Sequence, residues 1–241
     1  MKLNIEQLFL IFIIYSFLGY IAEVIYCRIV DGEFVNRGFL FGPLCPIYGF
    51  GAIFIIVLLH RFFHSPFLIF ILSIILTSFV EYITSFIMEK TFKAKWWDYS
   101  DLPYNLNGRI CLRNSLLFGL AAIVMVYVIN PVLFRLVFKI SAPVLNTSTT
   151  ILLIIFIIDI FISGIISISL KKSIVIATEA KKVKLKSIPG HLEKIITDQI
   201  NNLKRYPSHF LKGFPDLINI NKEAFDIMHK LKLKEKMKKK K

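Results

Sequence analysis

EYITSFIMEKTFKAKWWDYSDLPYNLNGRICLRNSLLFG, the segment Glu81–Gly119, joins two strongly apolar stretches of the chain. The first stretch carries an acid, Glu81, and then breaks into a run rich in tryptophan, aspartate, asparagine and arginine. The chain turns apolar again at Ile110 or just after Asn114. A plain connection between membrane helices does not need this density of aromatic, acidic, amide and guanidinium groups. The segment therefore predicts two membrane spans joined by a connection that is more than a linker.

The composition of the whole chain agrees with a membrane protein. Of its 241 residues 56% are hydrophobic, which is too many for an ordinary soluble domain. The net charge is +14, and residues 171–241 supply most of it, with 19 Lys/Arg against 7 Asp/Glu. A basic tail of this kind favours anionic membrane lipid as a partner before nucleic acid, and the chain has no nucleic-acid-binding motif.

Hydropathy predicts an all-α, polytopic integral membrane protein with about five transmembrane helices. A helix of about 20 apolar residues crosses the hydrocarbon core. Prolines and glycines at the beginning of the second span predict a broken or re-entrant start there. Residues 1–170 form the expected transmembrane domain, with spans at residues 7–27, 43–60, 67–88, 111–134 and 150–170.

The charge distribution predicts the orientation of these spans. Lys and Arg collect in cytoplasmic segments, so the basic tail 171–241 is expected in the cytoplasm and the N-terminus outside. Connections 28–42 and 89–110 then share the cytoplasmic face. The expected location is the plasma membrane, with several passes.

Short similarities suggest a direct repeat of two helical hairpins. SFLGYI (Ser16–Ile21) resembles SFVEYI (Ser78–Ile83), and FGAI (Phe50–Ile53) resembles FGLAAI (Phe118–Ile123). The alternative is chance, because apolar helices align easily with one another.

The basic tail is expected to begin as an extension of the fifth helix over residues 171–187, with a second helix over 191–203. Two roles remain open for it. It either docks on anionic lipid or on a partner, or it is a solvated tail that fixes the topology.

Polar residues inside or beside the spans are the candidates for a binding site. Acids within a membrane usually face a bundle interior or a wet cavity. Glu81 either belongs to such a site, with Arg37, Arg109 or Arg113 as a partner, or forms a structural ion pair. Asp159 is a third acid without an evident basic partner. The candidate binding residues are Glu23, Arg37, Glu81, Trp97, Asp98, Asp101, Asn105, Asn107 and Arg109.

Two interpretations of the connection 89–110 stay open as well. Its polar groups either satisfy the backbone of a loop that folds onto the cytoplasmic mouth, or they bind a polar or phosphorylated ligand. Trp96 and Trp97 also suit an interfacial aromatic belt.

Motifs of the common catalytic classes are missing from the sequence. It has no GxxxxGK[ST], HExxH, GxSxG or CxxC, so neither an enzymatic activity nor a cofactor or metal is expected. Three cysteines, Cys27, Cys45 and Cys111, fall near one membrane face. They favour small buried side chains over a three-thiolate zinc site.

Two long motifs carry a resemblance to a known family. NRGFLFGPLCPIYGFGA (Asn36–Ala52) and the segment Glu81–Leu112 resemble the family of small bacterial membrane proteins named CmpB-type ABC transporter permeases, to which some vertebrate transmembrane proteins are similar. The resemblance covers residues 8–170. Tyr20 stands where the family has Trp, and Arg113-Asn114 stand where apolar residues are expected. The name implies a permease subunit that uses an ATPase from another chain.

Three function hypotheses follow. The first is a permease-like protein with a polar cavity at the cytoplasmic mouth, lined by Glu23, Arg37, Glu81 and Arg109, and completed by a separate ATPase subunit or a homo-oligomer. The second is a structural or regulatory membrane protein whose motif loops are scaffold and whose tail binds anionic lipid or a partner. The third is a membrane enzyme that acts on lipid headgroups.

Overall fold

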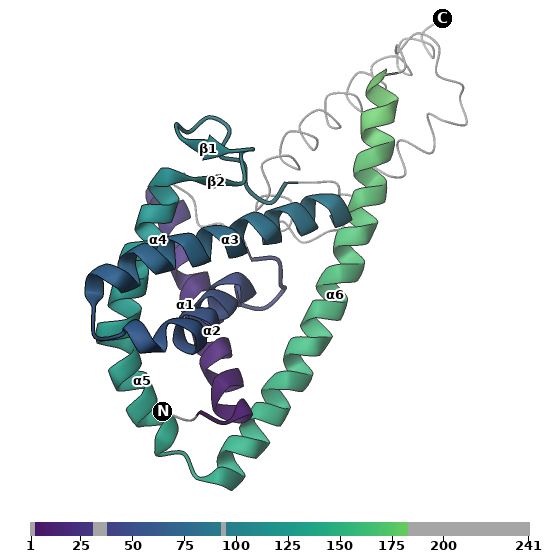
Figure 1. Ribbon diagram of the computed structural model, residues 1–241. Helices are drawn as coiled ribbons and strands as arrows, with labels where there is room; N and C mark the ends of the chain where they lie inside the picture. Colours follow the sequence, from purple (N-terminus) through teal and green to yellow (C-terminus); the bar gives the residue numbers. More distant parts are fainter. Residues whose placement is uncertain (1–2, 31–37, 93–94, 183–241) are drawn as a thin grey trace, which may run out of the picture.

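The computed structural model describes residues 3–30, 38–92 and 95–182 of the chain. Within these ranges the regular secondary structure is helical except for two very short strands, which confirms the predicted all-α polytopic fold (Figure 1). The elements in chain order are α1 (Ile5–Val30), α2 (Pro46–Leu59), a 3-10 turn η1 (His60–Phe62), α3 (Pro66–Phe92), β1 (Asn105–Leu106), β2 (Ile110–Cys111), α4 (Leu112–Val124), a π-helical turn η2 (Met125–Ile129), α5 (Asn130–Phe138) and α6 (Ala142–Lys182).

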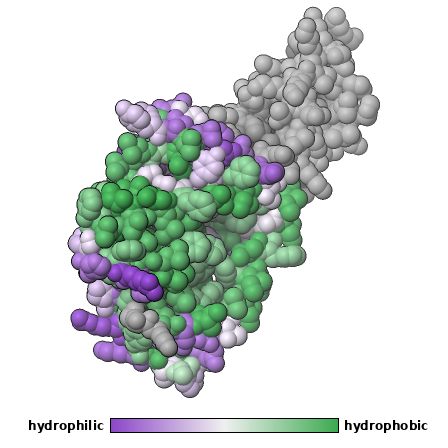
Figure 2. All heavy atoms as spheres, viewed as in Figure 1, coloured by the Kyte–Doolittle hydropathy of each residue, from purple (hydrophilic) through white to green (hydrophobic). Residues whose placement is uncertain are grey.

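Four helical segments in the described part of the chain are long and apolar enough to cross a membrane. They correspond to the first, third, fourth and fifth predicted spans, and their bounds are Ile5–Ile29, Pro66–Phe92, Leu112–Phe138 and Ala142–Ile168. Apolar side chains cover the middle of the molecule, whereas hydrophilic side chains gather at its two ends (Figure 2). This surface fits a protein whose apolar middle contacts membrane lipid.

The second predicted span differs from the others. Its helix α2 has 14 residues, so it is about 21 Å long at 1.5 Å per residue, whereas a hydrocarbon core is about 30 Å thick. Residues 38–45, the proline loop, precede it and are not helical. Pro43 and Pro46 explain this break, because proline is tolerated in the first turn of a helix and not in its interior. The predicted irregular start of this span is confirmed.

The fourth span is one continuous helical rod made of α4, η2 and α5. Pro131 lies at the beginning of α5, directly after the π-helical turn Met125–Ile129. Proline has no N–H to donate to the preceding turn, and a single wider turn accommodates the missing bond. The span therefore continues to Phe138, beyond the predicted end at residue 134.

The helices pack as two neighbouring hairpins, α1 with α2 and α3 with α4. Close approach depends on glycine in both. A Cβ at Gly49 would lie 2.7 Å from the carbonyl oxygen of Phe12 in α1, and a Cβ at Gly119 would lie 2.7 Å from Ile74 in α3. Ser78 of α3 and Ser115 of α4 also share a hydrogen bond of 2.8 Å. Two adjacent hairpins agree with the predicted repeat, and a duplication of the sequence itself stays a prediction.

Helix α6 has 41 residues and continues past its membrane-length part, as expected for the extension of the fifth span. The N-terminus lies at one end of the molecule, and the far end of α6 lies at the other, beyond the β strands (Figure 1). The tail helix predicted over residues 191–203 falls outside the described residues. Which end faces the cytoplasm stays a prediction.

One acid of α6 holds the proline loop. Asp159 accepts hydrogen bonds from the backbone N–H of Phe41 at 2.8 Å and of Gly42 at 2.9 Å, and from the hydroxyl of Ser163 at 3.1 Å. The partners of this intramembrane acid are therefore backbone amides and a hydroxyl. The carboxylate of Asp159 thus provides an acceptor for backbone N–H groups that the non-helical proline loop leaves without a partner.

Candidate functional site

The connection between α3 and α4 folds into an ordered hairpin loop, residues 95–111. Strands β1 and β2 are antiparallel, with Asn105 opposite Cys111 and Leu106 opposite Ile110. The turn between them places Asn107 and Gly108 at φ of 55° and 69°, a conformation that glycine and asparagine adopt most readily. The loop is thus a defined structure over the end of the bundle.

Most predicted site residues of this loop use their polar groups to hold it together. The indole N–H of Trp97 donates to the carbonyl of Arg109 at 2.8 Å. The side chain of Asn105 donates to the carbonyl of Leu102 at 2.7 Å and accepts from the N–H of Gly108 at 3.0 Å. Asn107 donates to the hydroxyl of Tyr82 on α3 at 2.9 Å. These groups act as the internal scaffold of the loop.

Asp98 has the same role. Its carboxylate pairs with Lys95 at 2.8 Å and accepts from the N–H of Ser100 at 3.0 Å. Partial burial acts to raise the pKa of Asp98, but the hydrogen bonds from Lys95 and Ser100 and the lysine charge outweigh it and hold the pKa below its ordinary value. Asp101 is exposed, and Arg37 lies outside the described residues.

Arg109 does not pair with Glu81. Its guanidinium contacts Glu89, in the last turns of α3, at 2.7 Å, and lies over the rings of Tyr82 at 5.3 Å and Phe86 at 5.5 Å. The span α3 runs to Phe92, further than the predicted end at residue 88, so it carries Glu89 to the foot of the loop. Arg109 thereby fastens the hairpin loop to α3.

Glu81 is 4% exposed and lies under the hairpin loop. The hydroxyl of Tyr99 donates to its Oε1 at 3.2 Å, whereas its Oε2 is buried and has no hydrogen-bond partner among the described residues. Asn114 of α4 interacts with Tyr99 as well, so the polar residue at the start of that span has a polar neighbour. Burial raises the pKa of Tyr99 far above its usual value, and the charges of Glu81 and Glu23 raise it further, so this hydroxyl stays a donor.

Glu23 of α1 joins the same group of side chains. The hydroxyl of Tyr48 in α2 donates to its Oε1 at 2.6 Å, and the charge of Glu23 acts electrostatically on Glu81. The structure therefore brings together two predicted site residues and two tyrosines, which we name the Glu–Tyr cluster: Glu23, Tyr48, Glu81 and Tyr99. Sequence reasoning missed both tyrosines, although each lies within a quoted motif.

The two motif-bearing connections meet at this end of the bundle. The ring of Phe39 in the proline loop packs against Phe92 at 5.6 Å and Trp96 at 5.8 Å between ring centroids. The backbone N–H of Cys45 also bonds the carbonyl of Ser16 in α1 at 2.9 Å. The described end of the first connection therefore packs against the end of α3 and the hairpin loop, whereas the shared cytoplasmic face stays a prediction.

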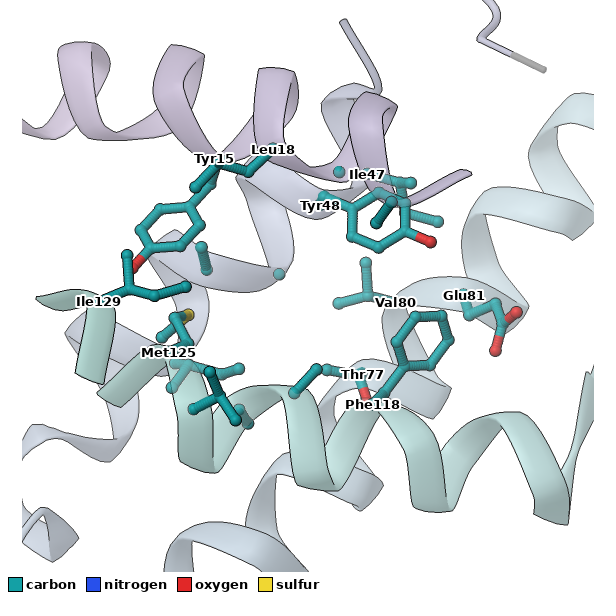
Figure 3. A pocket seen from close by; sticks show the side chains of 18 residues that line it. Tyr15, Leu18, Ile47, Tyr48, Thr77, Val80, Glu81, Phe118, Met125 and Ile129 are labelled. Atoms are coloured by element: carbon teal, nitrogen blue, oxygen red, sulfur yellow. The ribbon is translucent and has the colours of Figure 1, made fainter. Parts of the chain in front are cut away.

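A cavity of about 360 Å³, the central cavity, lies between the two hairpins below the Glu–Tyr cluster. Tyr48 and Glu81 lie at one end of it, and Tyr15 and Ile129 at the other (Figure 3). Its walls are otherwise apolar and include residues of α1, α2, α3, α4 and the π-helical turn. Size and lining are those of a small-molecule site, in which few polar groups fix the orientation of a ligand.

The far end of the central cavity has its own polar pair. The hydroxyl of Tyr15 donates to Oδ1 of Asn130 at 2.7 Å, and Asn130 is 1% exposed. Its Nδ2 has no hydrogen-bond partner among the described residues. Sequence reasoning missed this pair, and the signal was a tyrosine and an asparagine inside apolar spans, where polar side chains are costly.

The three cysteines are buried and unbonded to one another. Among the described residues, which include all three, no group of at least three His, Cys, Asp or Glu side chains is arranged to hold a metal.

Arg109→Lys should test the scaffold role of the guanidinium. We expect the free energy of unfolding to fall by about 1 to 2 kcal/mol, because lysine loses the planar stacking on Tyr82 and Phe86 and the guanidinium fork. Unfolding in detergent measures the change, and the matched control is Arg113→Lys at an exposed position. Equal stability of the two variants would contradict the scaffold role.

Comparison with known proteins gives one match. Residues 10–164 fit the model of the family described as "Putative ABC-transporter type IV", ABC_trans_CmpB. No curated protein and no solved structure matches the chain. The matched region contains both motif-bearing connections, the Glu–Tyr cluster and the central cavity. The chain therefore belongs to the ABC_trans_CmpB family.

Proposed function

We propose that the protein is a permease-like subunit that binds its cargo in the central cavity. The observation that carries the proposal is a pocket of about 360 Å³ between two helical hairpins, with Glu81 and Tyr48 in its lining at one end and Glu23 bonded to that tyrosine. The cluster at its end offers charge and hydrogen bonds to a ligand.

The site proposed here differs from the one expected from sequence. The hairpin loop lies over Glu81 through the hydroxyl of Tyr99, and its polar groups hold the loop together and fasten it to α3. These groups belong to Trp97, Asp98, Asn105, Asn107 and Arg109. Glu81 and Glu23 remain as the groups that face a ligand. The polar residues of the motif therefore have two proposed roles: those of the hairpin loop stabilise the loop, and those of the Glu–Tyr cluster bind the ligand.

The family name supports a partner that supplies energy. The sequence contains no GxxxxGK[ST], so a separate ATPase subunit would hydrolyse ATP. We place the protein in the plasma membrane of a bacterial cell, with its N-terminus outside and its basic C-terminal segment in the cytoplasm. The hairpin loop and the Glu–Tyr cluster then lie at the cytoplasmic end of the cavity.

A structural or regulatory role is the second candidate. The hydrogen bonds within the hairpin loop favour it, because they leave few polar groups of the motif for a ligand. In that case the motif fastens the helices, and the basic tail recognises anionic lipid or a partner.

Filling the central cavity separates the two candidates. Gly51 is buried and lines the cavity, yet a Cβ there would meet nothing within 4 Å. Gly51→Leu should therefore occupy the cavity without a backbone clash. Thermal unfolding of the purified protein is measured against a panel of lipids and polar metabolites. A compound at one hundred times its Kd should stabilise the wild type by about 2.7 kcal/mol and the variant not at all.

The matched control is Gly164→Leu in α6, where a Cβ also meets nothing within 4 Å and the cavity is distant. This variant should keep the full ligand effect. A compound that stabilises Gly51→Leu as much as the wild type would rule out the cavity as the binding site. Absence of any stabilising compound, with Glu81→Gln unstable on its own, would favour the structural role.

A further inference from the structure

We infer that the central cavity takes a hydrophobic organic cation, whose charge lies beside Glu81 and Glu23 and whose apolar part fills the space between the hairpins. The inference rests on the proposed function and names the class of its cargo. Three observations carry it: the sign of the charge at the cavity, the missing partner of Glu81 and the nature of the walls.

The charge at the central cavity is of one sign. Glu81 is the one Asp, Glu, Lys, Arg or His among the lining residues, and Glu23 lies behind the lining, bonded to the hydroxyl of Tyr48. Arg109 is engaged with Glu89, and Lys95 with Asp98. An anion placed here would meet two carboxylates in surroundings of low polarity, where repulsion is strong.

One oxygen of Glu81 has no partner among the described residues. Oε1 accepts from Tyr99, whereas Oε2 is buried and unpartnered among the described residues. A buried carboxylate without a counter-charge costs several kcal/mol, and a cation within contact distance offsets that cost. The polar groups that act on Glu81 are the hydroxyl of Tyr99 and the carboxylate of Glu23.

The mostly apolar lining of the cavity favours an organic cation over a metal ion. Metal ions of the hard class need six or more oxygen ligands, and the lining supplies few. At the acidic end the rings of Tyr48 and Phe118 lie 6.0 Å apart, edge to face. Aromatic faces beside a carboxylate attract quaternary ammonium and phosphonium groups, and the apolar walls hold hydrophobic substituents.

Binding of radiolabelled tetraphenylphosphonium to the full chain in nanodiscs of zwitterionic lipid tests the inference. Empty nanodiscs give the background from partitioning into lipid. We expect saturable binding to the wild type, at least tenfold weaker binding to Glu81→Gln and a smaller loss in Glu23→Gln. Glutamine keeps an acceptor for Tyr99, so the fold should survive. Glu6→Gln, the same substitution in the first turn of α1, should bind within twofold of the wild type.

Tetraphenylborate, an anion of the same shape, is the matched competitor and should not displace the cation. If the anion competes equally well, or if Glu81→Gln binds like the wild type while Gly51→Leu does not bind, the preference for cations is wrong and the cavity remains a binding site. If Gly51→Leu binds like the wild type, the cavity is not the site, and the proposed function fails together with the inference. Absence of saturable binding to the wild type overturns the inference alone.

Discussion

Gly49→Ala is expected to lower the free energy of unfolding by about 2 kcal/mol, within the range of overpacked cores. The added Cβ would lie 2.6 Å from the ring of Phe12 and 2.7 Å from its carbonyl oxygen, and it would also meet the hydroxyl of Ser16. The carbonyl cannot move cheaply, because it accepts the hydrogen bond of Ser16 at 2.7 Å within α1. Unfolding of the purified protein by increasing SDS in mixed micelles measures the loss.

Gly51→Ala is the matched control for this prediction, two residues along the same helix. Its Cβ would enter open space, and alanine favours the helix by about 0.5 to 1 kcal/mol over glycine. The control variant should therefore be as stable as the wild type or slightly more stable. Equal stability of the two alanine variants would mean that α1 and α2 do not approach as closely as described.

Asp159→Ala is expected to cost about 3 kcal/mol of unfolding free energy. The carboxylate accepts from two backbone N–H groups of the proline loop, and charge-assisted hydrogen bonds contribute about 1.5 to 3 kcal/mol each. Within a membrane, water cannot replace the lost acceptor. The variant should also expose the proline loop, so amide hydrogen exchange at Phe41 and Gly42 should accelerate.

Asp159→Asn should cause a smaller loss of unfolding free energy than Asp159→Ala, because the amide keeps one acceptor oxygen and loses only the charge. Its stability should fall between those of the wild type and Asp159→Ala. Unchanged exchange at Phe41 and Gly42 in the alanine variant would show that the loop does not depend on α6.

The hydropathy of the chain predicts most of the membrane fold, because a membrane span can be recognised from the order of its own residues. A helix in lipid must satisfy its own backbone and show apolar side chains outward, so apolar runs reveal the spans. The second span escapes this rule. Proline frees backbone donors there, and their acceptor, Asp159, comes from a helix more than one hundred residues later. No local pattern encodes such a partnership.

The pairing of side chains was equally hard to predict. Glu81 and Arg109 suit each other by charge, yet α3 extends far enough to offer Glu89 to the arginine, and Glu81 receives a tyrosine hydroxyl instead. The hairpin loop could have been predicted from the sequence, because Asn107-Gly108 is a strong turn signal between two short extended segments. The cavity could not be predicted from the sequence, because it depends on the space that the packed helices leave unfilled between them.

A rigid helix such as α6 would act as a lever if it tilted about the carboxylate of Asp159, where the proline loop is attached. Lys182 follows that acid by 23 residues, so the arm beyond the pivot is about 35 Å long. A tilt of about 10° at Asp159 would displace the far end of the helix by about 6 Å. The proline loop that Asp159 holds also leads into α2 and Tyr48. A change of shape at the Glu–Tyr cluster that tilted the helix at Asp159 would therefore produce its largest displacement at the far end of this arm.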